Sequence, residues 1–179
     1  MNQTKIIDNF LTQKETNILW KMVQKEWFGR KESRSKDFVE LWLDKNKLTA
    51  ELQKMIDQEN LNYNGISWWV HDSSIKRGHI DLSRGLPRHT DYDIVHFYKT
   101  GEKRHPEKTF IYYPFSYNNF SGGELVVNKD SENYETIHHK KNRLIIINAS
   151  LEHEILPFVG RRVSIAFSPW LEQPPGTLI

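Results

Sequence analysis

Three short apolar runs follow one another in residues 143–167, whose sequence is RLIIINASLEHEILPFVGRRVSIAF. Each run has the length of a β-strand, and polar or turn-forming residues separate it from the next; the runs are Arg143–Ile147, His153–Leu156 and Arg162–Phe167. β-Branched and aromatic residues fit a pleated, half-buried surface, so the pattern predicts consecutive strands. This stretch therefore favours a β-rich core.

The same pattern of short apolar runs separated by turn residues extends back along the chain to Asn64. Further runs of this kind are Ile66–Val70, Thr109–Tyr113 and Glu124–Val127, and loops rich in Gly, Pro and Asn lie between them. Short strands at such spacing are typical of a β-sandwich, jelly roll or barrel rather than of a parallel α/β sheet.

Residues 11–60 have a helical pattern instead. Thr12 and Glu15 stand at the spacing of a capping box, and apolar residues then recur at the helical period. A second helix is expected at about residues 46–59, and the charged segment Gly29–Asp37 is expected to connect the two helices. The N-terminal part of the chain is thus predicted to buttress the β-core.

A chain of 179 residues fits one domain and is long enough to bury a core. We expect a single domain over residues 1–179, with a helical buttress at about residues 1–60 and the β-core at about residues 64–170. The fold class is therefore predicted to be mainly β with N-terminal helices.

Composition excludes several kinds of function. The chain has no cysteine, which removes disulfides, thiolate nucleophiles and cysteine-ligated metal sites. Its net charge of +2 lacks the strongly basic face that nucleic-acid binding requires. No apolar run approaches the ~20 residues that span a bilayer, and the N-terminus has no apolar segment typical of a signal peptide. We therefore expect no nucleic-acid partner, no membrane association and a cytoplasmic location.

Two histidines and one aspartate form the first candidate site. In a strand, His89 and Asp91 would point to the same face because side chains two positions apart do so. Together with His153 they would make the set of two histidines and one carboxylate that binds non-haem Fe(II) and leaves positions open for substrate and O₂. A His-x-Asp pair is also common in structural hydrogen bonds, so the residues alone leave both interpretations open.

A second candidate site lies in the last predicted strand. Arg162 and Ser164 are two positions apart there and share one face. A guanidinium beside a hydroxyl group suits an anion, since arginine binds carboxylates through two parallel hydrogen bonds. A buried arginine needs an anionic partner, which is either an acidic side chain of the same chain or a bound ligand.

These motifs, taken in order, resemble the prolyl-hydroxylase-type branch of the 2-oxoglutarate/Fe(II)-dependent oxygenases. The segment Thr109–Tyr113 is similar to the family strand whose tyrosine reaches the co-substrate. The resemblance spans about residues 79–170. The residues that carry it are His89-x-Asp91, Gly122-Gly123-Glu124-Leu125, His153-Glu154-Ile155-Leu156-Pro157 and Gly160-x-Arg162-x-Ser164-Ile165.

The resemblance implies a double-stranded β-helix, the jelly roll also found in cupins, that holds Fe(II) through His89, Asp91 and His153. It implies O₂ and 2-oxoglutarate as co-substrates, and ascorbate is a further candidate cofactor. The expected activity is that of a dioxygenase that hydroxylates an unactivated C–H bond and releases succinate and CO₂. A peptidyl proline is the best single candidate for the hydroxylated group.

The resemblance also implies where 2-oxoglutarate binds. Its distal carboxylate would pair with Arg162, helped by Ser164 and Tyr113. Tyr113 is preferred to Tyr112 because the matching family tyrosine directly precedes the dipeptide that follows the strand. A second family tyrosine often lies ten residues before the first metal histidine, and His79 occupies that place here.

Other interpretations remain open at this point. The substrate is alternatively a free amino acid or another small molecule, since the metal and co-substrate residues are silent on its size. A cupin-like binding module without oxygenase activity would pair Arg162 with an internal carboxylate. Nucleic-acid dealkylation is disfavoured because no arginine or lysine follows Arg162 in the chain.

A few neighbouring residues receive simpler interpretations. Asp93 is expected to be a loop-facing carboxylate, or else a group that supports the metal ligands. His138 and His139 would point to opposite faces of a strand and receive no role. Trp68 and Trp69 are predicted to serve packing.

Overall fold

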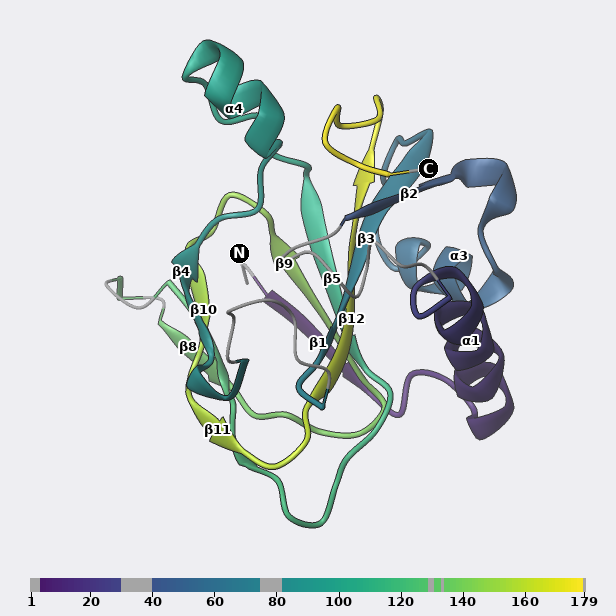
Figure 1. The fold of residues 1–179 in the computed structure, drawn as a ribbon, viewed down its shortest axis with the longest axis vertical. Coiled ribbons are helices and arrows are strands. Elements are labelled where there is room, and N and C mark those ends of the chain that lie inside the picture. Colours follow the sequence, from purple (N-terminus) through teal and green to yellow (C-terminus); the bar gives the residue numbers. More distant parts are fainter. Residues whose placement is uncertain (1–3, 30–39, 75–81, 129–130, 133, 179) are drawn as a thin grey trace.

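The structure is a computed structural model that describes residues 4–29, 40–74, 82–128, 131–132 and 134–178. Its largest feature is a six-stranded antiparallel sheet in the order β1-β9-β5-β12-β3-β2 (Figure 1). The strands in that order are β1 (Thr4–Asp8), β9 (Arg143–Asn148), β5 (Lys108–Tyr113), β12 (Val163–Trp170), β3 (Gly65–Asp72) and β2 (Leu41–Asp44).

A second antiparallel sheet has four strands in the order β4-β10-β7-β8. These strands are β4 (Leu86–His89), which follows the short 3₁₀ helix η2 (Leu82–Arg84), then β10 (His153–Ile155), β7 (Leu125–Val127) and β8 (Glu135–Ile137). A small pair, β6 (Ser121–Gly122) and β11 (Phe158–Val159), completes the strands. The predicted jelly-roll class is confirmed, and each of the six predicted runs coincides with a strand.

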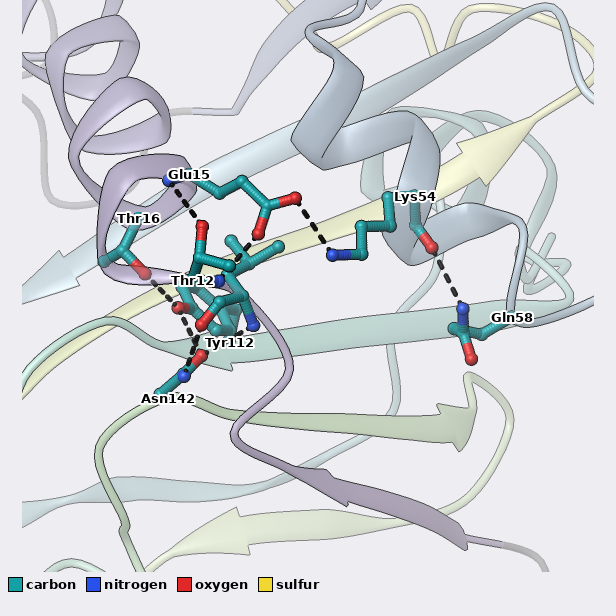
Figure 2. Close-up of polar contacts among 8 residues, drawn as sticks. Thr12, Glu15, Thr16, Lys54, Gln58, Tyr112 and Asn142 are labelled. Atoms are coloured by element: carbon teal, nitrogen blue, oxygen red, sulfur yellow. Dashed lines mark hydrogen bonds and ion pairs between the residues drawn. The ribbon is translucent and has the colours of Figure 1, made fainter.

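The first helix begins where the capping box predicts. Helix α1 (Gln13–Glu26) starts after Thr12, whose hydroxyl accepts a hydrogen bond from the Glu15 backbone at 3.2 Å. The Glu15 carboxylate accepts in return from the Thr12 backbone at 2.6 Å, and Lys54 lies 2.9 Å from the same carboxylate (Figure 2). This arrangement satisfies backbone donors that a helix N-terminus otherwise leaves without partners.

The prediction that residues 1–60 form a helical buttress is wrong in part. Strands β1 and β2 belong to the large sheet, where β1 pairs with β9 and β2 pairs with β3. Both lie at the ends of the strand order, and β2 also bonds through the Trp42 backbone N–H to the Leu178 carbonyl at 2.6 Å. Their partners are distant in sequence, so a local hydrophobic pattern does not identify them. The second helix, α3 (Ala50–Ile56), is shorter than expected and follows the 3₁₀ helix η1 (Lys45–Lys47). The expected connector Gly29–Asp37 lies outside the described residues apart from Gly29.

The large sheet has one face toward the helices and one toward the small sheet. Helices α1 and α3 lie together on one side of it (Figure 1). On this face Trp27 packs 5.4 Å from Trp68, and Phe110 stacks 4.9 Å from Phe167, between ring centroids. Residues of alternate position, such as Ala166 on β12, line a cavity on the opposite face. Because side chains alternate along each strand, one set of residues packs in the core under the helices and the other set lines the cavity.

A further helix, α4 (Ile94–Thr100), follows β4 and projects away from both sheets (Figure 1). Asp93 caps it by accepting a hydrogen bond from the His96 backbone at 2.9 Å, and Gly101 ends it in the left-handed conformation with φ of 78°. Arg104 binds the other carboxylate oxygen of Asp93 at 2.7 Å. Asp93 therefore stabilises helix α4 and the segment after it, and is not simply a carboxylate that faces solvent from a loop.

Among the helices of the described residues, none combines the length and the apolar character needed to cross a membrane.

Candidate metal centre and anion pocket

The two histidines of the predicted site face each other on neighbouring strands of the small sheet. His153 on β10 is paired in register with His89 on β4, and their ring centroids lie 4.4 Å apart. Asp91 completes the group, with Oδ1 at 3.9 Å from Nε2 of His89 and Oδ2 at 3.6 Å from Nε2 of His153. Three ligand atoms of these residues lie within 4.8 Å of one another, which suits a single metal ion.

Backbone carbonyls orient both imidazole rings. Nδ1 of His89 donates to the Pro87 carbonyl oxygen at 2.7 Å, and Nδ1 of His153 donates to that of Leu151 at 2.9 Å. With the proton on Nδ1, the lone pair of Nε2 faces the group. Burial lowers the pKa of His153, and its neutral form is the one that binds metals.

Asp91 reaches the histidines from a loop and not from a strand. Strand β4 ends at His89, so the predicted alternation along one strand does not bring the carboxylate into place. Hydrogen bonds of the loop do so: the Asp91 backbone N–H donates to the Ala149 carbonyl at 3.1 Å, and Nδ1 of His105 donates to the Asp91 carbonyl at 2.6 Å. The three side chains that the sequence predicted as ligands lie together, but a different local structure brings them there.

Arg162 is a buried cation beside two hydroxyl groups. Only 4% of the residue is exposed. One terminal nitrogen donates to the Ser164 hydroxyl at 3.1 Å, and the other donates to the Tyr113 hydroxyl at 2.9 Å. Its Nε has no hydrogen-bond partner, and no carboxylate of the described residues forms an ion pair with it. Because burying an unpaired charge is costly, this cluster is suited to bind an anion.

The two adjacent tyrosines of β5 point to opposite faces of the sheet. Tyr113 contacts Arg162, whereas the hydroxyl of Tyr112 lies 2.9 Å from that of Thr16 on α1 and donates to the Asn142 side chain at 2.9 Å (Figure 2). Of the two candidates, Tyr113 is thus the one placed beside the arginine.

One cavity joins the histidine–aspartate group to Arg162 and Ser164. It encloses about 360 Å³ of empty space, including the part open to solvent. Six of its other lining residues come from both sheets, and they are Trp69, His71, Ile111, Leu125, Ile155 and Ala166. The cavity therefore combines these polar groups with a largely apolar wall.

Several of these lining residues were missed or assigned another role from sequence. Trp69 was predicted to serve packing alone, and His71 and Thr109 received no site role. Period-two alternation along β3 would have placed Trp69 and His71 on one face, once the inner face of the sheet was known. His79, which stands at the family tyrosine position by count, lies outside the described residues.

His139 also lies beside the anion pocket. Its ring centroid is 4.5 Å from that of Tyr113 and 4.7 Å from that of Phe120. Burial lowers the pKa of His139 to about 4, and the nearby Arg162 charge adds to this effect. A neutral imidazole thus packs against the tyrosine that contacts Arg162, a position that the sequence interpretation did not foresee.

Comparison with known proteins agrees with this geometry. The family model described as "2OG-Fe(II) oxygenase superfamily" matches residues 78–171, more than half of the chain. No protein with a curated description matches in sequence.

Solved structures of prolyl hydroxylases share the fold. A Pseudomonas putida prolyl-4-hydroxylase superposes with a TM-score of 0.60 at 13% identity, over 97% of this chain and 90% of that chain. A Trichoplax adhaerens prolyl hydroxylase, solved with a hypoxia inducible factor peptide fragment, gives 0.60 at 16% identity over 96% and 84%. The viral collagen prolyl hydroxylase of Paramecium Bursaria Chlorella virus-1, solved with 2OG, gives 0.56 at 16% identity over 93% and 94%.

Proposed function

The chain belongs to the 2OG-Fe(II) oxygenase superfamily, and we propose that it is a hydroxylase of a peptidyl proline. As a member it is a 2-oxoglutarate-dependent dioxygenase that uses Fe(II) and O₂. The observation that carries the site assignment is that one cavity is lined both by the histidine–aspartate group and by Arg162, which has no ion-pair partner among the described residues.

His89, Asp91 and His153 fit an Fe(II) ion. They offer two imidazole nitrogens and one carboxylate from one side, the donor set of non-haem iron oxygenases, which leaves positions for co-substrate and O₂. The hydrogen bonds to the two Nδ1 atoms hold these nitrogens ready for the metal. We propose these three residues as the metal ligands.

Arg162, Ser164 and Tyr113 fit the distal carboxylate of 2-oxoglutarate. Arg162 is buried and has an Nε without a partner, so a carboxylate bound there would supply the missing anion. The rival binding module requires an internal carboxylate in this place, and none of the described residues provides one. The geometry therefore favours the co-substrate pocket.

When bound, iron and 2-oxoglutarate supply the oxidising chemistry, in which the co-substrate loses CO₂ to become succinate and one oxygen atom of O₂ enters the substrate. The protein contributes binding and orientation. Arg162 and the two hydroxyl groups fix one end of the co-substrate, while the histidines and Asp91 hold the metal at the other end of the cavity. Ile111, Leu125 and Ile155 contribute apolar side chains to the cavity wall, which makes the surroundings of the reacting atoms less polar.

The choice of a peptidyl proline is supported by the motif resemblance and by the fold shared with prolyl hydroxylases. One of those relatives was solved with a peptide fragment. A free amino acid is the alternative substrate, because the metal and anion groups do not depend on substrate size.

The site is tested by anaerobic titration with Fe(II) and 2-oxoglutarate, which produces a visible charge-transfer band when both bind. Asp91→Ala is expected to abolish the band, and Arg162→Gln to require far more 2-oxoglutarate. Arg161→Gln is the matched control, since Arg161 is bonded to Asp72 at 2.7 Å and is not a cavity residue. Thermal unfolding of each variant confirms that it is folded. No band in the folded wild-type protein would refute the proposed site.

The substrate is tested separately by mass spectrometry. The enzyme is incubated with Fe(II), 2-oxoglutarate and O₂ together with a library of proline-containing peptides and a set of free amino acids. Gain of one oxygen atom on a peptidyl proline is the expected result. Oxidation of free amino acids alone would overturn the peptidyl proposal and leave the oxygenase assignment intact.

A further inference from the structure

The Asp91 carboxylate is bound by a residue of the opposite sheet. The hydroxyl of Thr109, at the start of β5, donates to Oδ2 of Asp91 at 2.7 Å. Thr109 is 1% exposed, so water does not compete for this hydrogen bond. The contact joins the six-stranded sheet to the loop that follows β4 in the small sheet.

A second buried hydroxyl determines the direction of the hydrogen bonds. The Ser168 hydroxyl, 1% exposed on β12, lies 3.1 Å from that of Thr109. Thr109 has one hydroxyl proton, and an ionised carboxylate can only accept, so that proton goes to Asp91. Ser168 must therefore donate to Thr109, which gives an ordered chain from Ser168 through Thr109 to Asp91.

The two carboxylate oxygens of Asp91 are consequently not equivalent. Oδ2 already accepts the Thr109 hydrogen bond, while Oδ1 accepts none from the described residues and lies 3.9 Å from Nε2 of His89. A carboxylate held in this way keeps one orientation and presents the oxygen that the hydrogen bond leaves free.

We propose that Thr109, supported by Ser168, is a positioning residue that makes Asp91 a one-oxygen ligand of the metal. Through it the carboxylate binds with Oδ1 and does not swing to chelate with both oxygens. One coordination position is thereby kept for the other ligands. This inference rests on the proposed metal site and adds Thr109 and Ser168 to the residues that support it.

The test compares three substitutions of buried threonine. Thr109→Val keeps the shape of the side chain and removes the donor, while Thr109→Ser keeps the donor. Thr16→Val is the matched control, because Thr16 is 3% exposed and its hydroxyl contacts Tyr112, not a cavity residue. Fe(II) affinity and the position of the charge-transfer band with 2-oxoglutarate are measured anaerobically, so the readout does not depend on turnover.

Thr109→Val is expected to weaken Fe(II) binding by about 10–100-fold, the usual loss when a partner of a metal ligand is removed, and to shift the band. Thr109→Ser should restore both properties, and Thr16→Val should leave them unchanged. Wild-type affinity and an unshifted band in folded Thr109→Val would overturn the inference.

A further variant covers the case in which Thr109→Val does not fold. Ser168→Ala removes only the outer donor and should produce a smaller loss of Fe(II) affinity in the same direction, and an unchanged affinity would count against the chain of hydroxyls. Failure of the proposed function is recognised differently, since the wild-type protein itself would then show no band.

Discussion

The guanidinium of Arg162 donates a hydrogen bond of 2.9 Å to the hydroxyl of Tyr113, which lies 49 residues earlier in the chain. Arg162 has no acidic partner among the described residues, and its guanidinium donates to this phenol and to the Ser164 hydroxyl. The pair defines the end of the cavity at which an anion is expected.

Tyr113→Phe should therefore weaken 2-oxoglutarate binding without loss of the fold. A hydrogen bond to a charged group contributes about 1.5–3 kcal/mol, so the dissociation constant should rise by roughly one order of magnitude or more. Titration of the charge-transfer band measures it.

The neighbouring Tyr112→Phe is the control for that prediction. It removes hydrogen bonds to Thr16 and Asn142 on the helix side of the sheet, so it should lower the free energy of unfolding by about 1 kcal/mol and leave 2-oxoglutarate affinity unchanged. An equal loss of co-substrate affinity in both variants would show that Tyr113 acts through general packing.

Gly123→Ala should damage both stability and the anion pocket. Gly123 has a φ of +69°, and an added Cβ would lie 2.9 Å from Cζ of Phe120 and 3.3 Å from Cδ of Arg162. Strain at a left-handed position costs on the order of 1–3 kcal/mol, and the tight contact with Cδ requires the arginine stem to shift by a few tenths of an ångström. Thermal unfolding measures the loss of stability, and titration measures the affinity for 2-oxoglutarate. A destabilised variant with normal affinity would contradict the predicted damage to the anion pocket.

The stability of the metal-free protein should depend on Glu40. Burial raises the pKa of Glu40 to about 7 from 4.5, and the charges of Asp91 and Asp93 add to the shift. A carboxyl whose pKa is higher in the folded state favours folding in its protonated form. The free energy of unfolding should therefore be highest below pH 4.5, as far as Glu40 is concerned, and should fall as the pH rises to 7.

Glu40→Gln should remove this dependence. The free energy of unfolding is measured for both proteins after treatment with a chelator, at pH 4.5 and at pH 8. The value for the variant minus that for wild type should increase by up to about 3 kcal/mol between these two pH values. A pH-independent difference would show that Glu40 titrates normally.

Thr12→Ala should destabilise α1 alone. The substitution removes the hydroxyl that accepts from the Glu15 backbone, and loss of such a cap costs about 1 kcal/mol. Chemical denaturation measures the loss, Thr12→Ser should recover it, and Fe(II) affinity should be the same in all three proteins. A change in Fe(II) affinity would contradict this prediction, because it would mean that the start of α1 influences the metal ligands.

Much of the fold could be predicted because its strands are encoded locally. The runs around Ile111 and Ile165 alternate in the period of a strand, and Thr12 with Glu15 announces the start of α1. The edge strands β1 and β2 and the short helix α4 could not be predicted in this way. Edge strands form through pairing with residues far along the chain. Helix α4 has only seven residues, so its apolar pattern is too short to identify it, although Asp93 and Gly101 cap it locally.

The sequence by itself was enough to propose the site, because His89, Asp91, His153 and Arg162 stand in an order that resembles one family of oxygenases. Only the tertiary structure decided how these groups are held. Asp91 is positioned by a threonine of the other sheet, and Tyr113 rather than Tyr112 contacts the arginine because alternation sends them to opposite faces. These hydrogen bonds join residues that are far apart in the sequence and form only when the two sheets pack against each other. The spacing of residues along the chain does not encode such contacts.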